Sequence, residues 1–299
     1  MTTVLDVQRF KDEGRRFAVL TAYDYLSAKI LDEAGIPILL VGDSLGMVML
    51  GHPTTLPVTL DDMLHHAKAV ARGAKQALLV GDMPFMSYHA SVEQAITSAG
   101  RFVQEAGMHA VKLEGGGRVI EITRRLSEIG IPVMGHVGLT PQFVHQMGGF
   151  KVQGKTDAQA ARILADAKGL EQAGAFSIVL EGVPSKLASA IAHALRIPTI
   201  GIGAGPATDG QVLVLHDMLG LTSGKAPKFV KRYANLAEEV ARAATAYAAD
   251  VRDGKFPGPE HEYSANGSAP ATDSTRQGSP RTRGEASEFV GSEEVRYGG

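Results

Sequence analysis

Short runs of apolar, often β-branched residues alternate along the chain with longer segments in which apolar residues recur every three or four positions. The short runs lack the apolar and polar alternation of a half-exposed sheet, which predicts buried, parallel strands. Eight such runs are present: Phe17–Tyr23, Ile38–Asp43, Ala77–Asp82, Ala110–Glu114, Val133–His136, Ala175–Glu181, Thr199–Gly203 and Gln211–Leu215. Eight strands that alternate with helices predict an α/β fold, the (β/α)8 TIM barrel.

The segment after Met86 illustrates why the intervening pieces are predicted as helices. Ser91 and Gln94 have the spacing of a capping box, and apolar residues then recur at helical spacing as far as Ala106. Gly107 provides a stop signal, because glycine readily adopts the left-handed conformation that ends helices. Each such segment can therefore cover one strand of the barrel.

The end of the chain has a different composition. From Ser264 to Gly299, 17 of 36 residues are Ser, Thr, Gly or Pro, and Leu, Ile and Met are absent. A segment of this kind cannot bury enough apolar surface to offset the entropy of folding. The sequence therefore predicts a catalytic barrel domain over residues 1–260 and a disordered, low-complexity tail over residues 261–299.

Composition excludes several classes of protein. The formal net charge is -2, and basic residues occur at most in pairs, so the electrostatic signature of a nucleic-acid binder is missing. The absence of cysteine rules out disulfides and thiolate chemistry and is compatible with a reducing cytosol. The first residues lack a signal-peptide pattern, and the uncharged stretch Val133–Phe150 is too rich in Gly, Gln and His for a membrane span. We therefore expect a cytoplasmic protein that acts on small molecules.

Ionisable residues gather at the ends of the predicted strands. Five of the eight strands end in one, at Asp43, Asp82, Lys112 with Glu114, His136 and Glu181. The carboxyl ends of parallel strands converge at the mouth of a barrel, where active sites lie. Lys112 and Glu114 are two residues apart on one strand, so their side chains leave on the same face. These groups are therefore predicted to share one site.

The predicted site contains three carboxylates, those of Asp43, Asp82 and Glu114. Oxygen ligands without thiolates suit a hard cation, of which Mg²⁺ is the first choice. Any single aspartate could instead cap the loop or helix that follows its strand. Three converging carboxylates, however, would repel one another unless a cation or shared protons compensated. The sequence therefore predicts a magnesium site.

The roles of the other ionisable residues have alternatives. Lys112 is either a substrate contact or a structural counter-ion to a nearby carboxylate. His136 either orients substrate and moves a proton or is a hydrogen-bonded core histidine. Glu181 ends a strongly apolar run, where it can act as a proton-transfer base, or it forms a salt bridge with Lys186.

The strand-end motifs together resemble those of the ketopantoate hydroxymethyltransferase family, over about residues 3–255. The motifs that carry the resemblance are TAYDY at Thr21–Tyr25, VGDSLGMV at Val41–Val48, GDMPF at Gly81–Phe85, VKLEGG at Val111–Gly116, MGHVGLTPQ at Met134–Gln142, LEGVP at Leu180–Pro184, GIGAG from Gly201, and DGQVLV at Asp209–Val214. As a set they are highly specific. The segment beyond Ser264 lies outside the resemblance.

The resemblance implies an activity and a set of roles. The implied enzyme transfers a hydroxymethyl group from 5,10-methylenetetrahydrofolate to 2-oxoisovalerate and gives ketopantoate, in the pantothenate branch toward coenzyme A. By this resemblance, Asp43 and Asp82 would hold magnesium directly and so help to bind the substrate, and Glu114 would hold the metal through water. Ser44 and Lys112 would bind the oxygens of the keto acid. His136 would face its reacting end, and Glu181 would be the base. The family also implies a homo-oligomer, commonly a decamer.

Two other classes of function compete with this one. A magnesium-dependent 2-oxo acid carbon–carbon lyase of the isocitrate lyase-like superfamily is an alternative, although many such lyases use a cysteine-bearing loop and this chain has no cysteine. A non-catalytic barrel is the other alternative. In such a protein the ionisable groups at five strand ends would cost stability without a purpose.

Overall fold

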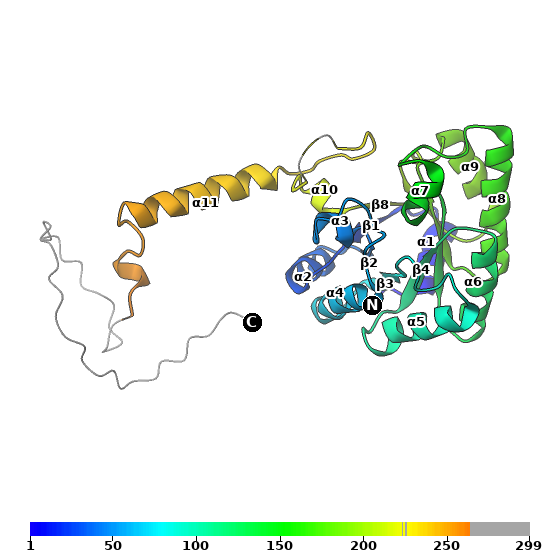
Figure 1. Cartoon of the computed structure of the whole chain (residues 1–299), viewed down its shortest axis with the longest axis horizontal. Coiled ribbons are helices and arrows are strands. Elements are labelled where there is room, and N and C mark those ends of the chain that lie inside the picture. The colour runs from blue at the N-terminus through cyan, green and yellow to red at the C-terminus, as the bar shows by residue number, and fades with distance from the viewer. Residues whose placement is uncertain (223, 225, 264–299) are drawn as a thin grey trace, which may run out of the picture. The chain divides into compact units, whose positions relative to one another are not determined.

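The computed structural model describes residues 1–222, 224 and 226–263, and its strands form a closed parallel barrel (Figure 1). The strands are β1 (Phe17–Thr21), β2 (Ile38–Val41), β3 (Leu78–Asp82), β4 (Ala110–Glu114), β5 (Val133–Gly138), β6 (Ser177–Glu181), β7 (Thr199–Ile202) and β8 (Gly210–Leu213). Each pairs with its neighbour in sequence, and β8 closes the barrel against β1. The predicted TIM barrel is confirmed, and every predicted strand overlaps an observed one.

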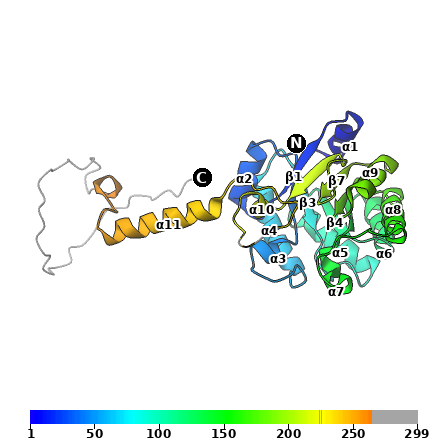
Figure 2. The same cartoon turned by 90° about the horizontal axis from the view of Figure 1, so that it is seen from above.

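Helices lie around the outside of the strands (Figure 2). The longer ones are α2 (Tyr25–Glu33), α4 (Leu60–Gly73), α5 (Val92–Gln104), α6 (Arg118–Glu128), α8 (Asp157–Gln172) and α9 (Ser185–Ala194). Helix α1 (Val4–Asp12) instead packs on the core inside the barrel. Short helices follow β2, β5 and β8: α3 (Leu45–Val48), the 3-10 helix η1 (Pro141–Phe143) with α7 (Val144–Met147), and α10 (Leu215–Met218).

Helix α5 begins at the predicted cap, with one difference. The Ser91 hydroxyl accepts a hydrogen bond from the backbone N–H of Gln94, as expected of a helix start. The Gln94 side chain, however, accepts from the N–H of Ala90 rather than from that of Ser91, so the reciprocal half of the capping box is displaced by one residue. Gly107 follows the helix with a φ of 68°, in the left-handed region that favours glycine.

The strands separate two apolar cores. One lies between the barrel and its helices. The other fills the barrel interior, where Phe17, Val19 and Ile38 pack with Val7 and Phe10 of α1. Because apolar side chains occupy the interior, the polar groups of the strands are left to gather at the carboxyl ends.

The alternation of strands and helices is broken once within the described barrel. The connection from β7 to β8, residues 203–209, contains no helix. Gly203 and Gly205 have φ values of 62° and 82°, and Pro206 follows them. Positive φ angles and proline are incompatible with a continuous helix, which explains why this crossover is irregular.

The chain divides into two units, Met1–Leu236 and Ala237–Gly299. The described part of the second unit contains nearly all of helix α11 (Leu236–Arg252) and a 3-10 helix, η2 (Pro259–His261). The predicted tail lies outside the described residues from position 264 onward, so its disorder and the predicted boundary at residue 260 stay predictions. Among the residues that are described, no helix has both the length and the apolar character needed to cross a lipid bilayer.

Candidate active site

The seven predicted site residues converge at the carboxyl ends of β2 to β6. Asp43 and Ser44 follow β2, whereas the other five lie on β3 (Asp82), β4 (Lys112 and Glu114), β5 (His136) and β6 (Glu181). All seven line a single cavity of about 1070 Å³. The structure therefore brings together every residue that the sequence placed at the mouth of the barrel.

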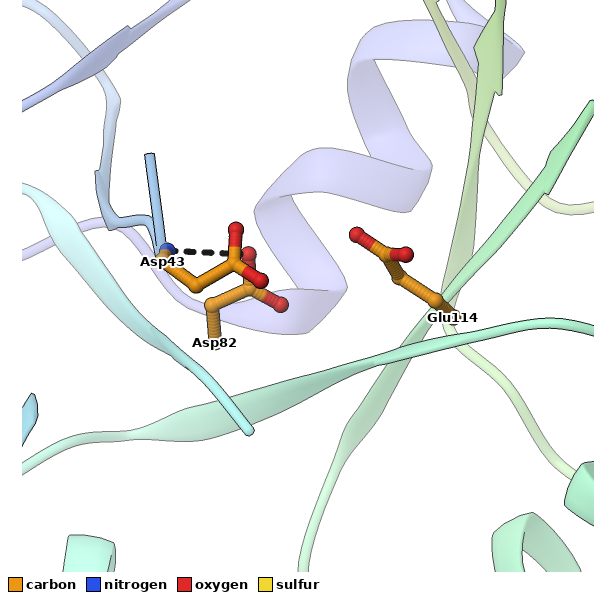
Figure 3. A group of neighbouring side chains, drawn as sticks. All are labelled: Asp43, Asp82 and Glu114. Atoms are coloured by element: carbon orange, nitrogen blue, oxygen red, sulfur yellow. Dashed lines mark hydrogen bonds between the residues drawn. The ribbon is translucent and has the colours of Figure 1, made fainter. Parts of the chain in front are cut away.

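Three buried carboxylates line one side of this cavity. Asp43, Asp82 and Glu114 each offer an oxygen atom, and these atoms lie within 4.8 Å of one another. Figure 3 shows the three side chains directed toward a common space. The backbone N–H of Asp43 also donates to Asp82 Oδ2 at 3.3 Å. Gly42 permits this arrangement, because a Cβ atom there would lie only 2.9 Å from the Ser44 hydroxyl oxygen.

Lys112 provides the positive charge nearest to these carboxylates. Its Nζ donates to both oxygens of Asp82 at 2.6 Å and lies 3.8 Å from Glu114 Oε1. Its side chain is only 5% exposed. Lys112 is therefore a buried counter-ion in this structure, and its tip remains at the cavity wall. Three carboxylates and one ammonium leave a net charge of minus two when all are ionised.

The pKa values of the cluster are unequal. Burial, followed by the charges of Asp82 and Glu114, raises the pKa of Asp43 well above its usual range. Burial also raises the pKa of Asp82, although Lys112 opposes the rise. Glu114 differs, because His136, Lys112 and the backbone N–H of Gln142 outweigh its burial and lower its pKa. Asp43 is thus the carboxylate whose charge the protein compensates least.

His136 connects the carboxylate cluster to Glu181. Its Nδ1 lies 3.5 Å from Glu114 Oε1, and its Nε2 lies 3.2 Å from Glu181 Oε2. Burial and the charge of Lys112 lower the pKa of His136, but the two carboxylates outweigh them and raise it to about 9. Neither ring nitrogen makes an aligned hydrogen bond within the described chain. The imidazole is therefore held between two charges with its N–H groups still available.

Glu181 lies at the border between the buried cluster and the open part of the cavity. Its side chain is 17% exposed, whereas that of Glu114 is 1% exposed. No ion pair joins it to Lys186 in the part of the chain that the structure describes, so the alternative salt bridge does not form. Glu181 can therefore reach both His136 and a molecule that enters the mouth.

Gln142 is a site residue that reasoning from charge missed. Its Nε2 donates to Asp43 Oδ2 and to the carbonyl of Met83, both at 3.0 Å. Its Oε1 accepts from the Tyr88 hydroxyl at 2.8 Å, and its backbone N–H donates to Glu114 Oε2 at 3.0 Å. This residue therefore fixes two of the three carboxylates relative to each other. The only sequence signal was its place in the MGHVGLTPQ motif, because an amide carries no charge.

Sequence comparison assigns the chain to a family. Residues 1–259 match the profile described as ketopantoate hydroxymethyltransferase. The chain belongs to the ketopantoate hydroxymethyltransferase family.

Curated members of the family are similar over nearly their whole length. A protein of Syntrophus aciditrophicus named 3-methyl-2-oxobutanoate hydroxymethyltransferase is 58% identical over 257 residues, which cover 86% of this chain and 94% of that protein. A protein of the same name from Chloroflexus aurantiacus is 59% identical over 259 residues, covering 87% and 92% of the two chains. Residues 1–259, which match the family profile, contain the barrel and every residue of the candidate site.

Solved structures outside the ketopantoate hydroxymethyltransferase family share the fold. The structure of 2,3-dimethylmalate lyase, a member of the PEP mutase/isocitrate lyase superfamily, aligns with a TM-score of 0.56 at 19% identity and covers 89% of this chain and 93% of the lyase. A phosphonopyruvate hydrolase in complex with oxalate and Mg²⁺ aligns with a TM-score of 0.56 at 15% identity, over 85% and 88% of the two chains. At these identities the likeness concerns the fold alone.

The contacts of Gln142 predict a large loss of stability when they are removed. We expect Gln142→Leu to lower the free energy of unfolding by about 3 kcal/mol, because Asp43, Tyr88 and the Met83 carbonyl lose a buried partner. In a domain of this size the melting temperature should fall by about 6–12 °C. Differential scanning calorimetry measures the change. Gln146→Leu is the control, since Gln146 is exposed, and an equal fall in both variants would contradict the role of Gln142.

The raised pKa of Asp43 predicts how stability depends on pH without added cations. A carboxyl group with a higher pKa in the folded than in the unfolded state holds its proton more tightly when folded, so stability falls as pH rises above the usual aspartate range. We expect Asp43→Asn to remove this loss and to raise the melting temperature at pH 8 by about 2–4 °C. The gain should shrink as the pH is lowered toward 4. A melting temperature for Asp43→Asn below that of the wild type at pH 8 would contradict a destabilising charge on Asp43. Asp250→Asn is the control, because Asp250 is exposed on α11 and its substitution should leave the melting temperature unchanged.

Proposed function

We propose that this chain transfers a hydroxymethyl group from 5,10-methylenetetrahydrofolate to 2-oxoisovalerate and releases ketopantoate, the precursor of pantothenate. The observation that carries the proposal is the convergence of seven polar side chains in one cavity, in a chain whose curated relatives bear the name of this activity. We place the reaction in the cytoplasm, in keeping with the lack of cysteine.

The carboxylate cluster fits a divalent cation. When its three carboxylates and Lys112 are all ionised, the cluster has a net charge of minus two, which one such ion balances. Asp43 Oδ1 accepts no hydrogen bond from the described residues, whereas Oδ2 is bonded to Gln142. Carboxylate oxygens are the ligands that Mg²⁺ prefers. Asp43 and Asp82 would hold the ion directly, and Glu114 would hold it through water. When bound, magnesium polarises the oxygens of the keto acid and acidifies the C–H next to its carbonyl. The phosphonopyruvate hydrolase with the same fold was solved with oxalate and Mg²⁺.

Two side chains are placed to bind the oxygens of the keto acid. Lys112 brings a buried ammonium to the cavity wall. Ser44 presents a hydroxyl whose oxygen lies 2.9 Å from the hydroxyl oxygen of buried Tyr23, which fixes its direction. Together with the metal ligands Asp43 and Asp82, these groups favour a small, anionic 2-oxo acid with its carboxylate toward β2 to β4.

Glu181 is placed to remove the proton from C3 of 2-oxoisovalerate. It lies where the buried cluster opens into the cavity, and His136 lies 3.2 Å away and holds the carboxylate in position. The proton passes from C3 to Glu181 Oε, and the electron pair of the C–H bond remains on the substrate. The methylene carbon of the folate has two bonds to nitrogen, and both must break. Water adds its hydroxyl to this carbon as the first of these bonds breaks, and the electron pair on C3 forms the new C–C bond as the second breaks. The two nitrogens take up the remaining proton of the water and the proton from Glu181, which leaves tetrahydrofolate. Binding both reactants in one cavity contributes much of the acceleration.

We further propose a homo-oligomer, the decamer common in the family. Multi-angle light scattering of the full chain tests this proposal. A mass of about ten chains supports it, and a monomer contradicts it.

Proton exchange without folate tests the proposed chemistry. With Mg²⁺ in heavy water, the enzyme should replace the C3 proton of 2-oxoisovalerate with deuterium, which proton NMR follows directly. Because the fold is shared with 2,3-dimethylmalate lyase, a carbon–carbon lyase is the second candidate. Cleavage of a 2-oxo acid, without exchange or transfer, would favour the lyase.

A further inference from the structure

The cavity is much larger than a small keto acid requires. Pockets of roughly 300–1,000 Å³ hold drug-sized ligands, and this one measures about 1070 Å³. The charged cluster of Asp43, Asp82, Lys112 and Glu114 lines only the side of β2 to β4. The rest of the cavity therefore has room for a second and larger molecule.

The side of the cavity near β6 and β7 is lined by apolar residues instead. These residues, which we call the apolar wall, are Phe150, Val152, Val183, Pro206, Pro227 and Phe229. Phe150 is 51% exposed and Phe229 is 39% exposed. Aromatic side chains exposed around a cavity mark a surface that a partner or ligand covers.

Two segments of the apolar wall, residues 150–152 and residues 227–229, lie close to Glu181. The backbone N–H of Gln153 donates to the carbonyl of Gly182 at 2.9 Å, which fixes the loop of Phe150 and Val152 beside the end of β6. Phe229 packs on Gly203 at the end of β7, where a Cβ atom would lie 2.9 Å from its ring. A flat ring system against these two segments would therefore lie next to the proposed base.

Two lysines lie on the same side of the cavity. Lys151 and Lys228 line it together with the apolar wall, and both are exposed. Neither forms an ion pair with any residue that the structure describes. Apolar surfaces flanked by free ammonium groups suit a ligand with aromatic rings at one end and carboxylates at the other.

We infer that the apolar wall binds the pterin and benzoyl rings of the folate, and that Lys151 and Lys228 bind the carboxylates of its glutamate. The identity of this ligand rests on the proposed function. In this arrangement the keto acid occupies the charged side of the cavity, the one-carbon carrier occupies the apolar side, and the two meet beside Glu181.

The contacts between the two lysines and the glutamate of the folate are tested by removing each side of the contact, alone and in combination. The truncated ligand is 5,10-methylenetetrahydropteroate, which lacks the glutamate. With the wild type, its KM should be about five- to tenfold above that of the full folate. In the double variant Lys151→Met with Lys228→Met, the two KM values should agree within about twofold. Lys155→Met is the matched control, because Lys155 is exposed and does not line the cavity; it should behave as the wild type does.

Truncation of Phe229 tests the apolar wall. Phe229→Ala should raise the folate KM by about tenfold, since both the aromatic contact and the apolar area that it buries are lost, and Phe229→Leu should restore part of the affinity. The KM for the keto acid and the folate-independent exchange of its C3 proton should stay near the wild-type values. Ile129→Ala, an exposed apolar residue outside the cavity, is the control.

The folate KM and the folate-independent exchange of the C3 proton together distinguish a failure of this inference from a failure of the proposed function. If exchange persists and the folate KM is unchanged in the lysine and Phe229 variants, the folate binds elsewhere and only the further inference is wrong. A loss of exchange in these variants would also overturn it, because the apolar wall would then serve the keto acid. If the wild type shows neither exchange nor transfer, the proposed function itself fails.

Discussion

Removal of divalent cations should reduce turnover by at least about a thousandfold, and added Mg²⁺ should restore it. The reason is electrostatic: the cluster of Asp43, Asp82 and Glu114 is buried and carries more negative charge than Lys112 can balance. A bound divalent cation contributes several kcal/mol to stabilising the charge that develops on the keto acid, and a thousandfold change corresponds to about 4 kcal/mol. Steady-state turnover in EDTA, then in excess Mg²⁺, measures the effect.

The variant Asp82→Asn provides the matching test on the protein side. The substitution keeps the shape of the side chain but removes its negative charge, so the cluster loses one carboxylate and Lys112 loses its closest ion-pair partner. We expect calorimetry to show that 2-oxoisovalerate binding no longer depends on Mg²⁺. Full activity of the wild type in excess chelator, or magnesium-dependent binding that survives in Asp82→Asn, would contradict the metal site.

Glu181→Gln should slow the exchange of the C3 proton by at least about a hundredfold, the lower size of a general-base contribution. The substitution is nearly isosteric and leaves the carboxylate cluster and Lys112 in place, so keto acid binding should persist. Proton NMR in heavy water gives the exchange rate, and calorimetry confirms binding. Lys112→Met is the comparison variant, because the loss of its ammonium should chiefly weaken binding.

The exchange experiment also distinguishes Glu181 from His136 as the group that accepts the C3 proton. His136 is the other proton acceptor within reach, but its raised pKa of about 9 favours the protonated ring near neutral pH. Unchanged exchange in Glu181→Gln would exclude Glu181 as the base.

The barrel could be predicted from sequence because its strands are buried on both faces. Residues Ala110–Glu114 form β4 with the predicted bounds, and β5 extends two residues beyond the predicted His136. The same regularity placed Lys112 and Glu114 on one face, since side chains alternate along a strand. The helix-free connection between β7 and β8 departs from the repeat, because its glycines and proline favour an irregular path.

The pairings inside the site could not be predicted in the same way. Spacing placed Lys112 among three carboxylates but did not identify Asp82 as its closest partner. Gln142 contacts Asp43 across 99 positions of sequence, and its neutral amide gave no charge signal. Glu181 had a nearby lysine in sequence, yet it contacts His136 of the neighbouring strand. Such contacts depend on how strand ends converge in three dimensions.

Transfer of a labelled carbon is the direct test of the proposed hydroxymethyl transfer. The full chain is incubated with Mg²⁺, 2-oxoisovalerate and 5,10-methylenetetrahydrofolate labelled with ¹³C in its methylene group, and the products are followed by carbon NMR. The label should appear in the hydroxymethyl carbon of ketopantoate, bonded to the former C3 of the keto acid. Label that stays on the folate while the keto acid is unchanged or cleaved would contradict the proposed transfer.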